Sequence, residues 1–167
     1  MPKVVFKVGD DISTDTIYPG RFMATVLPTE TPQHCFADYK EFNDKANRKE
    51  LPEGGIILAG NNFGCGSSRE QAASCIKGHG LTVVARGIAR IFLQNAVNLG
   101  LNTIIAPDVV AGEGDELALE KGALVNKTTG KSFAIVPHAP ARQAIIDAAG
   151  LIPYARRKLM EQHGKRA

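Results

Sequence analysis

The stretch Gly55–Ala106, GIILAGNNFGCGSSREQAASCIKGHGLTVVARGIARIFLQNAVNLGLNTIIA, decides the fold of this 167-residue chain. Short apolar runs alternate in it with two helix-like segments, so that the order reads 55–59, 67–77, 81–85, 88–99 and 102–106. Such runs are typical of strands buried on both faces, and the second helical segment repeats its apolar residues at 3.6-residue spacing. Alternation of strand and helix at these lengths predicts a parallel sheet with right-handed crossovers.

The rest of the chain adds elements around this core. Residues 3–8 predict a strand, and 22–53 look irregular, although Thr31-Pro32 can start a short helix and 43–50 reads as a polar surface stretch. Near the end, 123–126 and 131–136 predict a hairpin, and 140–149 a helix that Gly150 ends. The fold class expected is therefore mixed α/β, with a partly parallel sheet and flanking helices.

Composition excludes several classes of protein. The chain is 44% hydrophobic and 22% charged, with three cysteines, which is typical of one globular domain and argues against a disulfide scaffold. No apolar run is long enough to cross a membrane, and the N-terminus lacks a signal-peptide pattern. We therefore expect a soluble, cytoplasmic protein.

The positive charge is confined to the C-terminal end. Residues 154–167 hold five Lys or Arg against one Glu, a net charge of +4, which leaves −1 for residues 1–153 out of a total of +3. We divide the chain there, into a domain at 1–153 and a basic tail at 154–167. A basic tail of this kind is more often a solvated end or a partner contact than a nucleic-acid arm, and no basic face with interleaved aromatics is present. We expect no nucleic-acid partner.

The segment 60–70, GNNFGCGSSRE, carries the chemistry. It joins a buried strand to a helix, and open α/β sheets bind ligands at the carboxyl ends of their strands. Ser67-Ser68-Arg69-Glu70 fits a capping box, which predicts a helix start near Ser67 with free N–H groups that favour an anion. Arg69 would oppose the helix dipole there unless an anion lay between them, and a guanidinium grips a carboxylate bidentately. The residues predict an anion site, with a carboxylate as the favoured ligand.

The segment 60–70 also has features of other glycine-rich turns. A phosphate-binding P-loop does not fit, because position 65 is Cys and no Lys-Ser/Thr pair follows. A dinucleotide-binding turn does not fit the glycine spacing either. A glycine-rich turn whose serines merely cap the helix remains open on local spacing alone.

The residues of this segment resemble a known family. Its sequence is similar to the signature of the small subunits of 3-isopropylmalate dehydratase and archaeal-type homoaconitase, and to the swivel domain at the C-terminal end of aconitases. The resemblance extends to 10–20, DDISTDTIYPG, and to 89–100, ARIFLQNAVNLG, and covers about residues 4–150. It implies a swivelling β/β/α domain of the aconitase C-terminal type and a hydro-lyase that moves a hydroxyl between adjacent carbons.

The resemblance also implies roles for individual residues. Ser67 matches the base that takes the proton beside a carboxylate, while Ser68 and Arg69 match positions that bind substrate carboxylates. The hydroxyl leaves with the help of a [4Fe–4S] cluster, for which Cys35, Cys65 and Cys75 lack suitable spacing. We therefore expect this chain to bind no metal, and a separate large subunit to carry the cluster. A serine that served fully as a helix cap would be less free to act as a base.

Substrate choice is assigned by the resemblance to the residues after Pro19-Gly20. Homoaconitase-type loops place an Arg where this chain has Ala24, inside Phe22-Met23-Ala24-Thr25. Apolar neighbours suit a branched alkyl group, which favours 3-isopropylmalate and a role in leucine biosynthesis. Arg21 is a cation that could still reach a carboxylate, and 2,3-dimethylmalate would fit the same pocket.

Weaker signals complete the reading. Gln71 stands where many relatives have a titratable His, so any proton relay there is in doubt. The stretch 10–15 lacks the Gly and Glu of an EF-hand and reads as a turn close to the site. Histidines at 34, 79, 138 and 163 show no ligand spacing. A related hydro-lyase subunit, or an anion-binding module without chemistry, are the alternatives.

Overall fold

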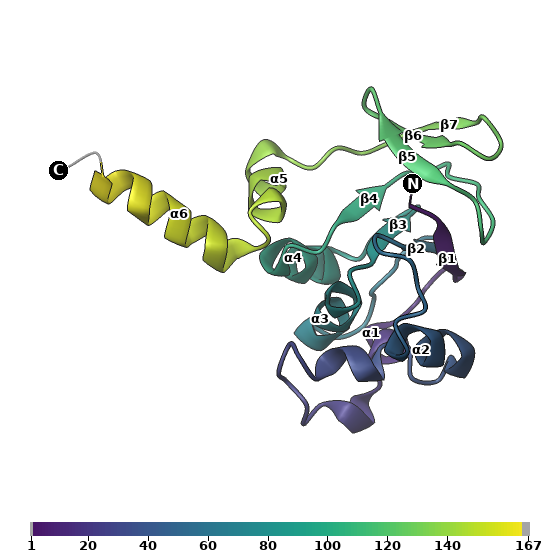
Figure 1. The fold of residues 1–167 in the computed structure, drawn as a ribbon, viewed down its shortest axis with the longest axis horizontal. Coiled ribbons are helices and arrows are strands. Elements are labelled where there is room, and N and C mark those ends of the chain that lie inside the picture. The colour runs from purple at the N-terminus through teal and green to yellow at the C-terminus, as the bar shows by residue number, and fades with distance from the viewer. Residues whose placement is uncertain (1, 165–167) are drawn as a thin grey trace.

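The computed structural model describes residues 2–164 and is built on a four-stranded parallel sheet (Figure 1). The sheet has the order β1-β2-β3-β4 with every neighbour pair parallel, and its strands are β1 (Val4–Lys7), β2 (Ile56–Ala59), β3 (Thr82–Ala85) and β4 (Thr103–Ile105). Each strand coincides with an apolar run of the sequence, so the predicted parallel core is confirmed.

Two helices connect the central strands. Helix α3 (Glu70–Gly78) runs between β2 and β3, and α4 (Arg90–Leu99) between β3 and β4. Gly100, at φ 72°, ends α4 in the left-handed conformation that glycine adopts without steric cost. Helix α3 begins three residues later than the capping box predicts: Arg69 holds the N-cap position and no side chain caps the helix.

An antiparallel sheet forms a layer of its own. Its order is β5-β6-β7, with β5 (Leu117–Glu120), β6 (Ala123–Asn126) and β7 (Ser132–Ala134). The predicted hairpin is therefore confirmed as β6–β7, whereas β5 was not predicted. Parallel and antiparallel strands lie in two separate sheets, with isolated bridges between them at Lys3↔Glu116 and Ile105↔Val136.

The parallel sheet buries both of its faces. One face of the sheet packs against the helices and includes Ile57, Val83 and Ala85. The opposite face packs toward β5 and β6 and includes Ile56, Leu58 and Val84. Residues on successive positions of a strand point to opposite faces, so one sheet serves two cores. The result is three layers, helices on parallel sheet on antiparallel sheet, which confirms the expected β/β/α arrangement (Figure 1).

The segment between β1 and β2 is more ordered than the sequence suggests. It contains four short helical elements, namely α1 (Thr14–Ile17), the 3-10 turns η1 (Gly20–Phe22) and η2 (Thr31–His34), and α2 (Lys40–Asn47). Helix α2 is polar, yet it buries Phe42, whose ring stacks on Phe6 with centroids 4.2 Å apart. The polar stretch predicted at 43–50 thus begins inside a helix anchored by an aromatic cluster.

Two helices end the described chain. Helix α5 (Pro140–Asp147) confirms the predicted element, and α6 (Leu151–Gly164) follows it and projects away from the body (Figure 1). The division expected between 153 and 154 therefore falls inside α6, and Lys165 and Arg166 lie outside the described residues. Within residues 2–164, no helix combines the length and the apolar character needed to span a membrane.

Candidate active site

The glycine-rich segment lies at the carboxyl end of β2, beside the segment that leaves β1. Because β1 and β2 are parallel neighbours, both segments emerge at the same edge of the sheet. Backbone hydrogen bonds join them: Asp11 N donates to Asn61 O, Gly64 N to Ile12 O and Thr14 N to Cys65 O, at 2.7 to 2.9 Å. The two family-like stretches, far apart in sequence, therefore form one structural unit.

Acidic and amide side chains reinforce this unit. Asp10 accepts a hydrogen bond of 2.6 Å from the backbone N–H of Asn61, and Asp11 accepts one of 2.8 Å from the side chain of Asn62. No group of three His, Cys, Asp or Glu side chains suited to a metal ion occurs among the described residues. The acidic stretch acts here as a clamp on the loop, as the turn prediction suggests.

Ser67 lies at this junction with its hydroxyl free of the helix. Its backbone N–H donates to Thr14 Oγ1 at 3.1 Å, and its own Oγ lies 3.1 Å from that same oxygen. Thr14 is buried, with 1% of its surface exposed, whereas Ser67 is exposed. Because α3 begins at Glu70, the predicted cap role of Ser67 is wrong, and the conflict between capping and acting as a base disappears.

Arg69 is held by an internal anion. Its Nη1 donates to Asp15 Oδ1 and to Tyr18 O, and the hydrogen bond from Arg69 holds the pKa of Asp15 below its usual 3.8. Asp15 thus supplies a carboxylate from within the chain on the Nη1 side of this arginine, and the predicted binding of an anionic ligand stays a prediction. Among the described residues, no group accepts from the buried Nε, and none of the hydrogen bonds found involves Nη2. The Nε–Nη2 edge keeps the donors that a bidentate carboxylate requires.

Two glycines shape the loop for different reasons. At Gly64, with φ 78°, a Cβ would come within 2.3 Å of the Phe92 ring, so the close approach is to the core rather than to a ligand. Gly66, at φ 97°, has more space and sets the turn that leads to Ser67. Ser68 is exposed, and its carbonyl accepts a hydrogen bond of 3.1 Å from Asn95 on α4.

The predicted specificity loop starts against Arg69. Gly20 N donates to Asp15 Oδ1 at 2.9 Å, and a Cβ on Gly20 would meet Arg69 Nη2 at 3.2 Å. The hydroxyl of Tyr18 then donates to the carbonyls of Phe22 and Thr25, at 3.2 and 3.1 Å. Burial raises the pKa of Tyr18, which keeps this hydroxyl protonated as a donor.

Side chains of the loop divide into anchored and exposed groups. Arg21 pairs with Asp38 and lies 4.7 Å from the centre of the Phe22 ring, which stacks on His34. Met23 and Ala24 are exposed. Arg21 can thus reach a substrate only by leaving Asp38, whereas the apolar tip of the loop is open to a ligand or a partner.

The cysteine side chains do not form a cluster-binding set. Cys35 and Cys75 are buried in the helical core, while Cys65 is part of the glycine-rich loop. Burial raises the pKa of Cys75 well above its usual value, and a neighbouring Cys35 raises it further. Cluster ligands are thiolates, so the buried Cys75, whose raised pKa keeps it protonated, does not suit an iron–sulfur site.

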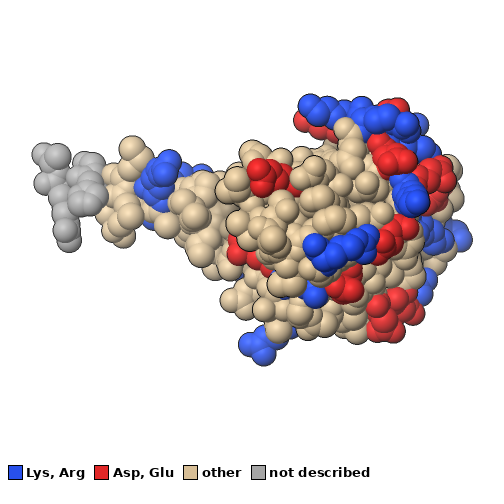
Figure 2. Space-filling model, turned by 90° about the horizontal axis from the view of Figure 1, so that it is seen from below, with Lys and Arg blue, Asp and Glu red and all other residues tan. Residues whose placement is uncertain are grey.

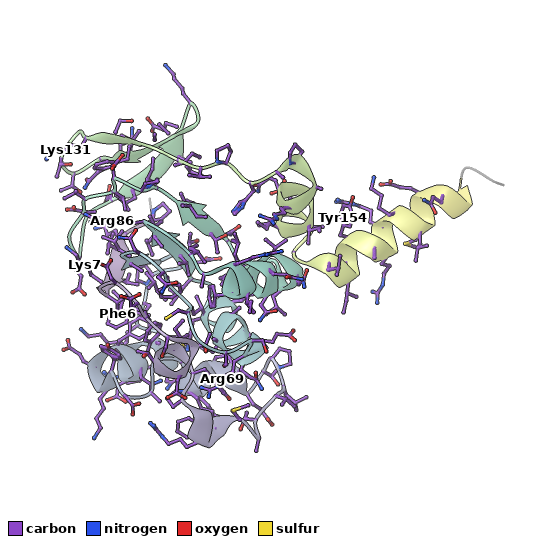
Figure 3. The ribbon with its side chains drawn as sticks, turned by 180° about the vertical axis from the view of Figure 1, so that it is seen from behind. Phe6, Lys7, Arg69, Arg86, Lys131 and Tyr154 are labelled. Atoms are coloured by element: carbon purple, nitrogen blue, oxygen red, sulfur yellow. The ribbon has the colours of Figure 1, made fainter. Side chains whose placement is uncertain are left out.

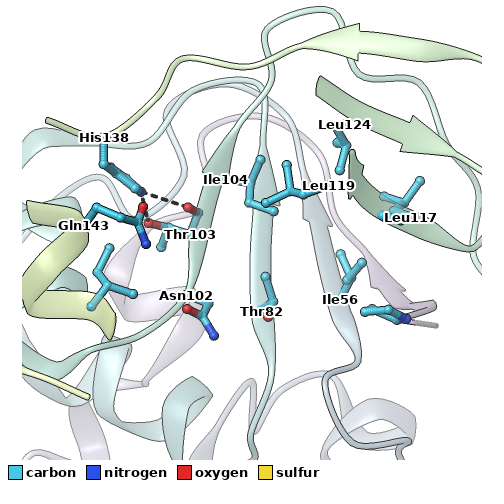
Figure 4. A pocket seen from close by; sticks show the side chains of 13 residues that line it. Ile56, Thr82, Asn102, Thr103, Ile104, Leu117, Leu119, Leu124, His138 and Gln143 are labelled. Carbon is cyan, nitrogen blue, oxygen red and sulfur yellow. Dashed lines mark hydrogen bonds between the residues drawn. The ribbon is translucent and has the colours of Figure 1, made fainter. Parts of the chain in front are cut away.

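Two of the hollows on the surface lie at opposite ends of the sheet. Beside the loop, a shallow groove of about 520 Å³ is lined by Cys65, Gly66 and the first turn of α4, including Arg90. At the amino ends of the strands, a pocket of about 420 Å³ lies between the two sheets, where His138 bonds to Thr103 (Figure 4). This second pocket contains no Arg or Lys and no predicted site residue.

The site as a whole is better ordered than sequence reasoning anticipates. Ser67, Ser68 and Arg69 lie together on the loop, and Figure 3 shows Arg69 in the body of the molecule, away from the projecting α6. Sequence reasoning missed Thr14, Asp15 and Tyr18 as partners of these residues. The one signal in the sequence was that all three residues lie in the stretch 10–20, which resembles the family as a whole.

Known proteins resemble this chain over almost its whole length. The family model described as Aconitase C-terminal domain matches residues 10–108. The small subunit of 3-isopropylmalate dehydratase from Moorella thermoacetica is 44% identical over 90% of this chain and 92% of its own length, and that from Aquifex aeolicus is 43% identical over 93% and 94%. A 2,3-dimethylmalate dehydratase small subunit from Eubacterium barkeri is 40% identical over 90% and 93%.

A solved structure agrees with these sequences. The crystal structure of 3-isopropylmalate dehydratase from Methanocaldococcus jannaschii matches with a TM-score of 0.87 and 38% identity, over 98% of this chain and 97% of that one. Sequence identity, coverage and fold therefore all indicate the same family. The chain belongs to the family of 3-isopropylmalate dehydratase small subunits, which are built on the aconitase C-terminal domain.

Proposed function

We propose that this chain is the small subunit of a 3-isopropylmalate dehydratase, which interconverts 2- and 3-isopropylmalate in leucine biosynthesis. The observation that carries the proposal is that neighbouring residues of one segment hold both groups: Thr14 bonds to the exposed Ser67, and Asp15 bonds to Arg69 Nη1, while the buried Nε of Arg69 has no acceptor among the described residues. The relatives named above, at up to 44% identity, support the same activity. Its place would be the cytoplasm.

Ser67 would act as the base. In dehydration, its Oγ, present as the alkoxide, takes the proton from the carbon next to a carboxylate and becomes the neutral hydroxyl, the electron pair of that C–H bond forms the double bond, and the neighbouring hydroxyl departs as hydroxide. Thr14 Oγ1 already accepts the N–H of Ser67, so its own proton is available to donate to Ser67 Oγ. Such a hydrogen bond stabilises negative charge on the serine oxygen. In rehydration, Ser67 returns the proton to the other carbon.

Arg69 and Ser68 would hold the substrate's carboxylates. The Nε–Nη2 edge of Arg69 offers two parallel donors, and Asp15 fixes the guanidinium from the Nη1 side. The Ser68 hydroxyl lies on the exposed side of the loop, where its carbonyl is fixed by Asn95. Binding both carboxylates orients the C–H bond toward Ser67.

A [4Fe–4S] cluster, held by a separate large subunit, would supply Lewis-acid assistance to the departing hydroxyl. The absence of a group of three possible metal ligands among the described residues, and the burial of Cys35 and Cys75, fit such a division of labour. What this chain contributes is therefore the base, the carboxylate clamp and the loop that selects the side chain.

The loop 21–25 would select a branched alkyl group. Ala24 supplies no charge for a further carboxylate on the side chain of the substrate, and Met23 and Phe22 offer apolar contacts. Homoaconitate is disfavoured for that reason. The second candidate substrate is 2,3-dimethylmalate, which the relative at 40% identity favours.

The proposal is tested by co-expression with a large subunit of 3-isopropylmalate dehydratase from the same organism, under anaerobic conditions. We expect a complex that hydrates isopropylmaleate to isopropylmalate, with a lower kcat/KM for dimethylmaleate. Failure of the two chains to associate, or a complex that hydrates no alkylmaleate, would overturn it. A preference for dimethylmaleate would replace the substrate and leave the chemistry intact.

A further inference from the structure

Helix α6 contacts the body only at its base. Apart from Tyr154, every side chain from 151 to 162 is exposed, and the contacts that tie α6 down involve α4 and α5 (Figures 1 and 3). A helix of 14 residues is about 21 Å long, and in isolation such a length is marginally stable in water. The projecting part of α6 therefore lacks a surface to stabilise it.

One face of α6 is apolar. Ile152, Leu159 and Met160 are 74%, 56% and 70% exposed, and with Ala155 and Arg156 they follow the i, i+3, i+4, i+7, i+8 spacing of a single helical stripe. A solvated helix rarely exposes its large apolar residues on one line, whereas a helix that docks in a groove presents them in this way. We define these five residues as the α6 stripe.

The charges around the stripe indicate what it contacts. Arg156 lies in the stripe and Arg157 beside it, while Lys158 pairs with Glu161 at 3.4 Å. In Figure 2 the body shows basic and acidic side chains interspersed, whereas only basic ones are visible on the helix. An apolar stripe bordered by two uncompensated arginines is complementary to an apolar groove with carboxylates at its rim.

Pairing with a second copy of the same helix fits less well. In a two-fold antiparallel pair, Ile152 would lie opposite Leu159 and Arg156 opposite Ala155, which brings the two Arg156 side chains together near the axis. Like charges at the centre of an interface are desolvated without compensation and cost free energy. The sequence of the stripe therefore favours a different chain as the partner.

We infer that the α6 stripe is a docking arm that binds an apolar, acid-rimmed groove on the large subunit. This inference rests on the proposed function, because it assumes that a large subunit exists. A single helix buries less area than a specific interface requires, so the arm supplements contacts around the active site. Its contribution is affinity, not chemistry, because α6 projects away from the part of the body that carries Arg69 (Figure 3).

The test compares variants of the full chain in binding to the purified large subunit. Ile152→Ser/Leu159→Ser removes the apolar contacts, and Arg156→Glu/Arg157→Glu reverses the charge. Val110→Ser is the matched control, since Val110 is 55% exposed on the body, close to the 56% of Leu159. All substituted side chains are exposed, so circular dichroism and Tm should stay near those of the wild type.

We expect Kd for the large subunit to rise at least about tenfold in both double variants and to stay unchanged in the control. At saturating large subunit, kcat should be that of the wild type. An unchanged Kd in the double variants would overturn the docking arm while the complex and its activity stand. Absence of any complex with the wild-type chain would instead overturn the proposed function, and the arm with it.

Two further measurements use the free chain. Light scattering that showed a wild-type dimer and a monomeric Ile152→Ser/Leu159→Ser variant would assign the stripe to self-association and refute the inference. Binding of the wild-type chain, but not of the variants, to phosphatidylserine vesicles would assign it to a membrane surface and refute it equally. We expect a monomer that does not bind the vesicles.

Discussion

Thr14→Val isolates the hydrogen bonds that position the proposed base. Valine has nearly the shape of threonine, but it cannot accept the N–H of Ser67 or bond to its Oγ, both of which lie 3.1 Å from Thr14 Oγ1. Thr14 is 1% exposed, so water cannot replace the lost hydroxyl easily. The change therefore acts on Ser67 without removing it.

The expected size follows from these contacts. A hydrogen bond contributes about 0.5–1.5 kcal/mol net, so the loss of two of them corresponds to about 1–3 kcal/mol. Since about 1.4 kcal/mol corresponds to tenfold in rate, kcat should fall roughly ten- to a hundredfold. KM should change little, because Ser68 and Arg69 are untouched.

The assay is steady-state hydration of isopropylmaleate by the complex with the large subunit. Thr14→Ser keeps the hydroxyl and should recover most of kcat. Thr31→Val is the matched control: Thr31 is fully buried and bonds to Ser74 Oγ at 3.0 Å away from the loop, so its loss should lower Tm and leave kcat near that of the wild type. Equal losses of kcat in the Val and Ser variants of Thr14, or no loss in either, would refute the positioning role.

Three more predictions concern the clamp, the loop and acid stability. Arg69→Lys should raise KM and lower kcat/KM for isopropylmalate, because lysine lacks the bidentate edge; unchanged constants would contradict the clamp. Ala24→Arg should shift the ratio of kcat/KM toward homoaconitate, and an unaltered ratio would remove this loop from substrate choice. Hydrogen bonds from the N–H of Gly112 and the side-chain amide of Asn126 lower the pKa of Asp115 below its usual 3.8. The ionised carboxylate therefore adds to the free energy of unfolding above pH 3.8, and this contribution is lost as the pH falls through the lowered pKa. Asp115→Asn should therefore flatten the decline of the urea midpoint below pH 4, and an identical decline in both proteins would contradict this.

Local pattern was sufficient for the core of the fold. The strands β2, β3 and β4 are short apolar runs with a helix between each pair, and no other arrangement buries both faces of such strands. Most of helix α2 lies in the stretch 43–50, which has the composition of a polar surface. Seven of the eight residues of the helix are polar or small, and the remaining one, Phe42, packs against Phe6 of the distant strand β1. Strand β5 has exposed residues at Leu119 and Glu120, which weakens the alternation that would reveal it.

The site shows the same limit of local reasoning. The sequence at 67–70 fits a capping box, yet the helix begins at Glu70. The N–H of Ser67 donates instead to Thr14 Oγ1, and the guanidinium of Arg69 donates to Asp15. Both partners come from a segment that follows another strand. A tertiary contact overrides a local capping signal, and no pattern within the motif reports it.

The central claim is that Ser67 removes the proton from the substrate. Its most direct test is kcat of the Ser67→Ala complex, with Ser132→Ala, an exposed serine in β7, as the control. General-base catalysis contributes about 10²–10⁴-fold, so kcat should fall by at least about a hundredfold while Kd for the large subunit stays unchanged. Turnover by Ser67→Ala at the rate of the wild type and of Ser132→Ala would contradict the claim.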